Sequence, residues 1–353
     1  MKTTKHNKGF LLLCVLVFAV SAATAQSQSK EIKKEFPAIS GDILEVENKF
    51  GNITILNWDK PEISVSIKLS ADSKSEAAAQ SILSKMSVDL RKENNTIIAR
   101  TILNNESGVS QGSRFAVDYT VYVPKWINLT LVNKFGNIHI DEISGLVNIE
   151  LKHGDLRINN LSRGNVKPYN QLVLAYSNGV IDQAGSLKLD LSFSKIEVEK
   201  ADVFTAQTKY SGINAITCNS FFCESKYDNF KFDEVKNLSG NLQYSNLKAG
   251  KFSGKLELET SYTGVKIEQV LPSFESIKIN NSRGSYKIGI HPETSFDLYG
   301  NSSRGEFDLE EFKILEKKTE GSSKTIRAVA GKEGTGKLIS ISSVDGTVSL
   351  FLN

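Results

Sequence analysis

Apolar and polar residues alternate along most of this chain, and the alternation recurs in copies that begin at a leading residue, usually an aromatic one. Alternation with period two is typical of β-strands that bury one face. The leading residues are Phe135, His153, Tyr176, Phe193, Tyr210, Tyr227, Tyr244 and Tyr262, with later copies at Arg283 and Arg304. From Tyr176 to Tyr244 the copies are 17 residues apart, which indicates a repeated structural unit.

Within each copy the apolar residues lie four residues before the leading residue and three, five and eight residues after it. The column five residues after it consists of Ile140, Ile158, Ile181, Val198, Ala215, Phe232, Ala249, Ile267, Ile288 and Leu309. One copy cannot bury such columns alone, but copies stacked about 4.8 Å apart can. We therefore predict an all-β fold, a parallel β-solenoid or β-helix with coils of about 17 residues over residues 132–312.

The two ends of the chain depart from this pattern. Residues 26–131 are predicted to form a β-rich region with one helix at about 73–86, because alanines and larger apolar residues recur there at helical spacing, with Asp72 or Ser73 as the N-cap. Residues 313–353 are predicted to form C-terminal cap strands. Caps are expected because the bare end of a solenoid is an open sheet edge.

Residues 1–25 have the pattern of a secretory signal peptide: three lysines, an apolar run from Phe10 to Val20, and Ala23-Thr24-Ala25 as the cleavage site. An uncleaved membrane anchor is the alternative. We expect an exported protein, located in the periplasm, on the outer-membrane surface or outside the cell. The chain has 43 basic and 40 acidic residues, and removal of those three lysines balances the charge. A basic field for nucleic acid is therefore absent, and no later apolar run is long enough to span a membrane.

Three short motifs resemble a known family. Tyr119-x-Val121-x-Val123-Pro124, Leu129-x-Leu131-x-Asn133 and Gly136-x-Ile138-x-Ile140 resemble a bacterial adhesin-like family of secreted domains of unknown function, common in Bacteroidetes. The resemblance implies a β-solenoid in the cell envelope. It brings no catalytic residues and no cofactor to this chain.

Residue patterns typical of catalysis are missing from the sequence. Cys218 and Cys223 fall in apolar columns, so we expect small core residues, with a local disulfide as the alternative. His139, His153 and His291 have no metal-ligand spacing. The acids form no visible cluster, and no phosphate-binding or nucleophile motif is present. We expect a non-enzymatic protein without cofactor or metal; a carbohydrate-active β-helix enzyme is the alternative and requires clustered carboxylates.

Two columns are candidates for a ligand surface. The first, Lys231, Lys248, Lys266 and Lys287, lies four residues after the leading residue and can hold anionic glycans or lipid headgroups, although Asp233 and Glu268 favour simple charge balance. The second comprises the leading residues Tyr210, Tyr227, Tyr244 and Tyr262, which can stack on sugar rings if they are exposed. Period-two alternation instead predicts that these rings point into the core. The sequence thus favours an adhesin-like binding or structural solenoid with a glycan or protein partner in the envelope or outside the cell.

Overall fold

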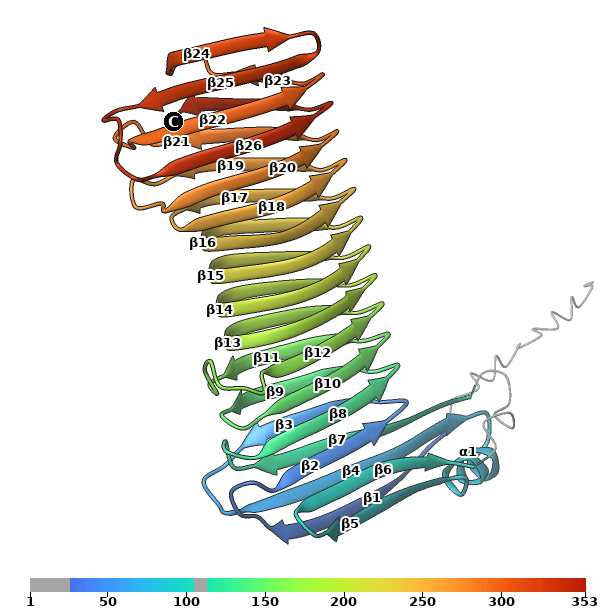
Figure 1. The fold of residues 1–353 in the computed structure, drawn as a ribbon. Helices are drawn as coiled ribbons and strands as arrows, with labels where there is room; N and C mark the ends of the chain where they lie inside the picture. Colours follow the sequence, from blue (N-terminus) through green and yellow to red (C-terminus); the bar gives the residue numbers. More distant parts are fainter. Residues whose placement is uncertain (1–25, 105–112) are drawn as a thin grey trace, which may run out of the picture.

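The structure is a computed structural model that describes residues 26–104 and 113–353; the predicted signal peptide lies outside them. The fold is all-β with a single described helix. Strands stack into a long solenoid with two opposite faces (Figure 1). Face one contains strands that end at a leading residue: β2 (Ile43–Asn48), β8 (Asn128–Lys134), β10 (Val147–Lys152), β12 (Asn170–Ala175), β18 (Lys255–Ser261), β20 (Ser276–Ser282), β26 (Leu338–Val344) and β22 (Phe296–Ser303).

Face two contains the strands that begin after a leading residue. These are β3 (Ile53–Asn57), β9 (Ile138–Ile143), β11 (Asp155–Leu161), β17 (Asn246–Phe252), β19 (Gly264–Val270), β21 (Ser285–Ile290), β27 (Thr347–Leu352) and β23 (Glu306–Asp308). Four long strands start on face two, bend at the second corner and finish on face one: β13 (Asn178–Ser192), β14 (Lys195–Lys209), β15 (Gly212–Lys226) and β16 (Asn229–Gln243).

The pairing within both faces is parallel and in register. Lys195 of β14 lies beside Asn178 of β13 and beside Gly212 of β15, so each of these coils takes 17 residues. The predicted solenoid fold is confirmed. Figure 1 shows the coils stacked along one axis from β2 to β22.

The predicted apolar columns form the narrow core between the two faces. Phe232 is 1% exposed and packs on Phe221, with ring centroids 4.9 Å apart. Ile158, Ile267 and Ile288 of the same column are fully buried. Because the core is a single layer of side chains thick, each inward position contacts both faces of the sheet, so the apolar spacing of the sequence determines the fold directly.

The first coil lies earlier in the chain than residue 132. Strands β2 and β3 stack directly on β8 and β9. Strands before β2 and after β3 extend each face beyond the first coil: β1 (Gln26–Pro37), β4 (Glu62–Ser73) and β7 (Arg114–Val123) continue face two, and β5 (Met86–Glu93) and β6 (Thr96–Leu103) continue face one. These strands cover the free edges of the first coil.

The helix α1 spans Glu76–Leu83, shorter than predicted, and its N-cap is Ser75, whose hydroxyl accepts a hydrogen bond from the amide of Ala78 at 3.3 Å. The predicted N-caps, Asp72 and Ser73, were wrong. Both residues belong to β4, where pairing with β1 keeps their backbone extended. Tertiary pairing here overrides a local capping pattern.

Of the cap strands predicted within residues 313–353, the first two cover the end of the solenoid and the last two do not. Strands β26 and β27 insert between the coil of β20–β21 and the coil of β22–β23. The end is covered instead by the antiparallel hairpin of β24 (Lys313–Glu320) and β25 (Ser323–Ala330), with β25 pairing to β22. The last residues of the chain therefore lie inside the stack (Figure 1).

Candidate functional site

The leading residues lie on the first corner of the solenoid and point to solvent. The tyrosines among them are between 38% (Tyr227) and 57% (Tyr176) exposed, so the prediction of an inward ladder was wrong. The physical reason is the backbone: each leading residue has a positive φ, for example 52° at Tyr210 and 64° at Tyr227. This left-handed conformation breaks the period-two alternation and turns the side chain outward.

The exposed rings stack into one continuous column that we call the aromatic edge. Its members are Phe50, Phe135, His153, Tyr176, Phe193, Tyr210, Tyr227, Tyr244 and Tyr262. Neighbouring centroids are 4.8 to 5.3 Å apart, and the rings are within 21° of parallel. The face of each ring is therefore covered by the next ring in the column. What remains available to a ligand is the row of ring edges and tyrosine hydroxyls, not the faces on which a sugar would stack.

Beneath the aromatic edge runs a buried ladder of hydrogen bonds. Its members directly follow the leading residues: Ser177, Ser194, Ser211, Asp228, Ser245 and Thr263. Each side-chain oxygen accepts from the backbone amide one coil below, as when Ser194 Oγ accepts from the amide of Ser177 at 3.2 Å. The hydroxyls also donate to the carbonyl two residues earlier. The ladder was not predicted from the sequence, although the small and hydroxyl residues after each leading residue were a usable signal.

Asp228 is the one carboxylate in this ladder. It is 1% exposed, and its oxygens accept four hydrogen bonds, from the Thr208 hydroxyl at 2.6 Å, the Ser211 amide at 2.6 Å, the Ser225 hydroxyl at 2.7 Å and the Lys226 amide at 2.9 Å. A buried carboxylate with this many donors holds its neighbours in fixed positions. It thereby fixes the backbone under Tyr210 and Tyr227.

Polar side chains flank the aromatic edge on both sides. On the side of face one, the ammonium groups of Lys209 and Lys226 lie 5.7 and 5.5 Å from the ring centroids of Tyr210 and Tyr227, within the range of cation–π attraction. On the side of face two, the amide of Asn246 donates to Asn229 Oδ1 at 3.2 Å.

The predicted lysine column is real but partly neutralised. Lys231, Lys248, Lys266 and Lys287 are side by side on face two and exposed. Lys231 pairs with Asp233 at 3.3 Å and Lys266 with Glu268 at 3.2 Å. This column lies four residues from the aromatic edge and does not join it in one site.

Arg283 and Arg304 are not adjacent in the column of leading residues. Asp345, the leading residue of the inserted coil, lies between them and pairs with both. Arg283 also donates a hydrogen bond to the hydroxyl of Tyr262, with its guanidinium 5.4 Å from the ring. The column thus ends in a charged cluster that closes the aromatic edge.

The remaining candidate residues are structural. Cys218 and Cys223 are buried free thiols, as the core interpretation predicted, and burial raises the pKa of each to about 12. His153 is stacked between Phe135 and Tyr176. His139 contacts the Asp141 carboxylate at 3.2 Å, a pairing that its spacing did not suggest. Within residues 26–104 and 113–353 no group of three metal-binding side chains is present, and no helix is long and apolar enough to cross a membrane.

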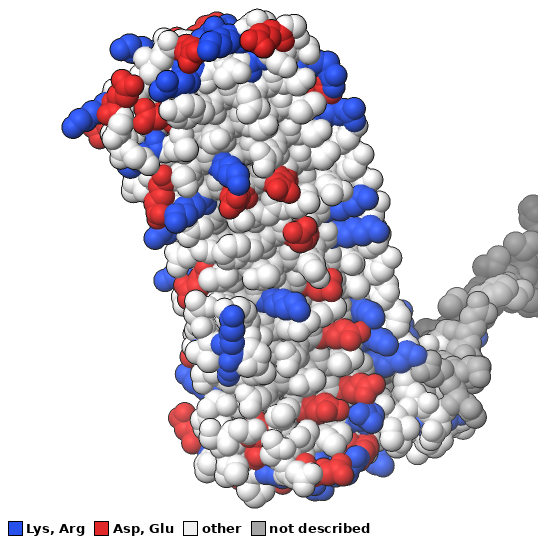
Figure 2. Space-filling model, viewed as in Figure 1, with Lys and Arg blue, Asp and Glu red and all other residues white. Residues whose placement is uncertain are grey.

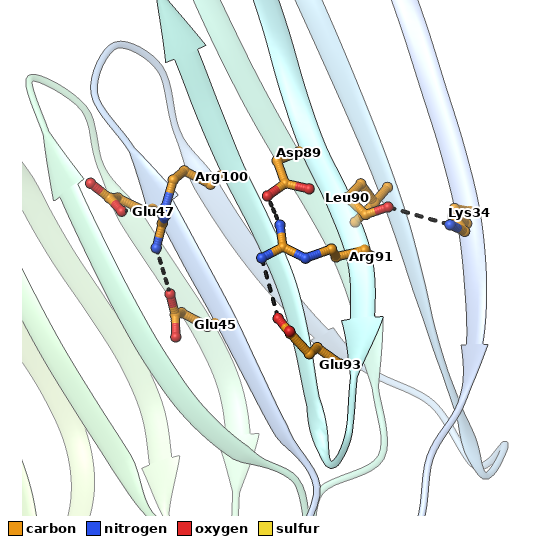
Figure 3. Close-up of polar contacts among 8 residues, drawn as sticks. All are labelled: Lys34, Glu45, Glu47, Asp89, Leu90, Arg91, Glu93 and Arg100. Carbon is orange, nitrogen blue, oxygen red and sulfur yellow. Dashed lines mark hydrogen bonds and ion pairs between the residues drawn. The ribbon is translucent and has the colours of Figure 1, made fainter.

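Charges at the N-terminal end neutralise one another (Figure 3). Arg100 pairs with Glu47 at 2.7 Å and Glu45 at 3.2 Å. Arg91 pairs with Asp89 and Glu93. The guanidinium groups of Arg91 and Arg100 are therefore neutralised, in contrast to the ammonium groups on the flank of the aromatic edge.

Comparisons with known proteins add only a general likeness. No protein-family model matches the chain, and no curated protein matches it. Among solved structures it is similar to a candidate cell adhesion protein from Clostridium sporogenes (11% identity, 92% of this chain and 100% of that one, TM-score 0.19) and a candidate adhesin from Bacteroides fragilis (10%, 91% and 97%, 0.30). A third is a candidate lipid binding protein from Parabacteroides distasonis (9%, 92% and 96%, 0.37).

Two of these names agree with the adhesin-like family that the sequence motifs resemble. Identities and TM-scores this low carry no argument about function. The case for a function therefore depends on the geometry of the aromatic edge.

Proposed function

We propose that the protein is a non-enzymatic, exported binding protein of the cell envelope, adhesin-like in its role, and that the aromatic edge contacts an extended glycan. The observation that carries the proposal is the unbroken row of solvent-exposed rings, repeated once per coil. Exposed aromatic residues in a contiguous row are unusual on a surface that contacts only water. The ring faces are already covered, so the contacts to a glycan are hydrogen bonds from tyrosine hydroxyls and packing on ring edges.

The tyrosine hydroxyls support this assignment. Those of Tyr176, Tyr210, Tyr227 and Tyr244 form no hydrogen bond with any residue of the described part of the chain. A phenol hydroxyl is both donor and acceptor, which suits the hydroxyl-rich surface of a sugar. The tyrosine hydroxyls and the asparagine amides of the corner are held in rows by the stacked backbone. Few side chains therefore lose conformational freedom when a glycan binds.

A carbohydrate-active enzyme is the second candidate. The observation in its favour is a surface depression of about 360 Å³ on face two, lined by Glu197, Glu199 and Asp233 among others. A general acid at neutral pH needs a carboxyl group whose pKa is raised by burial. Glu197 and Asp233 instead expose 54% and 53% of their side chains and pair with Lys195 and Lys231. These contacts favour a binding protein.

A glycan array tests the proposal with three proteins. The wild type is compared with the Tyr227→Ala, Tyr244→Ala pair and with Tyr227→Phe, Tyr244→Phe, which keeps the stack but removes the hydroxyls. We expect the alanine pair to lose binding and the phenylalanine pair to weaken it. Phe222→Ala, an exposed residue of face one, is the control and retains binding. Equal binding by all four proteins, or none by the wild type, contradicts the proposed site. Release of reducing sugars by the wild type would instead favour the enzyme.

A further inference from the structure

We infer that the aromatic edge takes an acidic, linear polysaccharide whose chain lies parallel to the solenoid axis, with uronic acid carboxylates beside Lys209 and Lys226. The inference rests on the proposed function and specifies its ligand. It is carried by the charge on either side of the tyrosines and by the spacing of the coils.

The columns next to the tyrosines contain basic and neutral residues but no acid. On the side of face one, the column that precedes the leading residues consists of Ala175, Ser192, Lys209, Lys226, Gln243 and Ser261. On the side of face two, the column two residues after them consists of Asn178, Lys195, Gly212, Asn229, Asn246 and Gly264. From Tyr176 to Tyr262 a ligand therefore meets no acid in these two columns; the second column continues to Asp155 only at the coil of His153, and Lys195 in it pairs with Glu197.

Lys209 and Lys226 are the basic residues best placed to meet an anion. They are adjacent in the parallel register and exposed. Neither forms an ion pair with a described residue, and each ammonium group is held beside a tyrosine ring. The nearest outward acid on their own strands, Glu224, belongs to the next column. Figure 2 shows basic side chains at intervals along one edge of the molecule, on the right in this view, with acidic ones on the adjoining face.

The surface beside the tyrosines is hollowed. A depression of about 410 Å³ is lined by Phe193, Lys195, Tyr210 and Asn229 among others. It spans neighbouring coils along the aromatic edge, not a single coil. This shape admits an extended ligand that crosses successive coils and continues beyond the depression in both directions, as a polymer does.

The coil spacing fits a sugar polymer. Rings repeat every 4.8 to 5.1 Å from His153 to Tyr262, close to the length of one pyranose unit in an extended β-1,4-linked glycan. Successive sugars can therefore recur at the spacing of successive coils, with alternate units facing opposite sides of the chain. Uronic acids carry one carboxylate per unit, so every second carboxylate faces the flank that contains Lys209 and Lys226 and is opposite to these ammonium groups in sign.

Calorimetric titration of the full chain tests the inference with two probes of equal length, an alginate oligosaccharide, which is a uronic acid polymer, and a neutral cello-oligosaccharide. We expect the wild type to bind alginate more tightly and to lose affinity as salt rises. The Lys209→Gln, Lys226→Gln pair should bind alginate about tenfold more weakly. The matched control, Lys248→Gln with Lys287→Gln on face two, should bind it as the wild type does.

The outcomes separate the inference from the proposed function. Equal affinity for both probes, or unchanged alginate binding by the Lys209→Gln, Lys226→Gln pair, overturns the acidic ligand; if binding is still lost in Tyr227→Ala, Tyr244→Ala, the glycan-binding function stands. Loss of alginate binding in the face-two control moves the site to the lysine column and also overturns the inference. No binding of either probe by the wild type counts against both.

Discussion

The guanidinium of Arg304 forms a two-pronged pair with the carboxylate of Asp345, with Nε 2.7 Å from Oδ1 and Nη2 3.0 Å from Oδ2. The two residues are 41 positions apart in sequence but occupy adjacent coils. The hydrogen bond from Arg304, with the charges of Arg304 and Arg283, holds the pKa of Asp345 below its ordinary value of 3.8. The pair links the inserted coil of β26–β27 to the coil above it.

This pair predicts an acid-sensitive C-terminal end. Because the pKa of Asp345 is lower in the folded protein, its contribution to stability is complete above pH 3.8 and is lost as the pH falls through the lowered value. The protection factors of the β26 amides against hydrogen exchange should fall over that interval in the wild type. In Asp345→Asn the exchange should already be faster at neutral pH and should show less acid dependence. The exposed Asp190→Asn serves as the control; an identical acid dependence in all three proteins would refute the role of Asp345.

Two phenylalanines of neighbouring strands give a sharp test of the core columns. Phe232 is 1% exposed and Phe222 is 45% exposed. Phe232→Asp places an unpaired charge inside a core one layer thick and should lower the free energy of unfolding by several kcal/mol, on the order of 4. Phe222→Asp should change it by less than about 1 kcal/mol. Denaturant titration followed by circular dichroism measures both, and equal midpoints would exclude the assigned inward column.

The buried carboxylate of Asp228 should be essential to the hydroxyl ladder. Asp228→Ala removes the carboxylate that Thr208, Ser211 and Ser225 share as an acceptor and should destabilise the protein by about 3 kcal/mol. Asp228→Ser should cost less, because serine occupies the same position in the coils on either side. The two variants are compared by denaturant titration. A serine variant no more stable than the alanine variant would contradict the ladder.

The thiols of Cys218 and Cys223 should be inert in the folded protein. Burial raises the pKa of both thiols to about 12, so the reactive thiolate is scarce at pH 8 and the sulfur is shielded. A thiol reagent such as DTNB should react slowly with the native protein and rapidly in denaturant. In a chain without residues 1–25, which contain the third cysteine, Cys14, the substitution Cys218→Ser isolates the signal of Cys223. Rapid labelling of either thiol under native conditions would argue against its place in the core.

The sequence analysis predicted the solenoid because apolar spacing alone sets its columns. It failed at the leading residues because a left-handed backbone at a tyrosine such as Tyr227 leaves no mark on the alternation of apolar and polar positions. If the backbone is assumed to be extended throughout, the alternation places Tyr227 in the core and Asp228 in solvent. The structure has Tyr227 exposed and Asp228 buried. The acceptor role of Asp228 depends in part on Ser211 and Thr208, donors 17 and 20 residues earlier in the chain, which no local pattern contains.

The position of the last coil was beyond prediction for a different reason. The turn Ser343-x-x-Gly346 fits the corner of any coil equally well, so local sequence does not state which neighbours β26 and β27 will have. Pairing with β20 and β22 at once is decided by the whole stack. The tyrosines of the candidate ligand surface were named from the sequence. Lys209 and Lys226 were overlooked because the other residues of their column are not basic.

The inserted coil sets an order on assembly. The coils of residues 26–290 can stack before the strands that complete the far end are in place. Strands β22 to β25 can join the stack only after Leu338–Leu352 has paired with β20 and β21, because they lie above that coil. A chain that lacks its last residues keeps unpaired edges on β20 and β21, open to pairing with other chains. Residues Leu338–Leu352 are therefore needed to join the last coil to the rest of the solenoid.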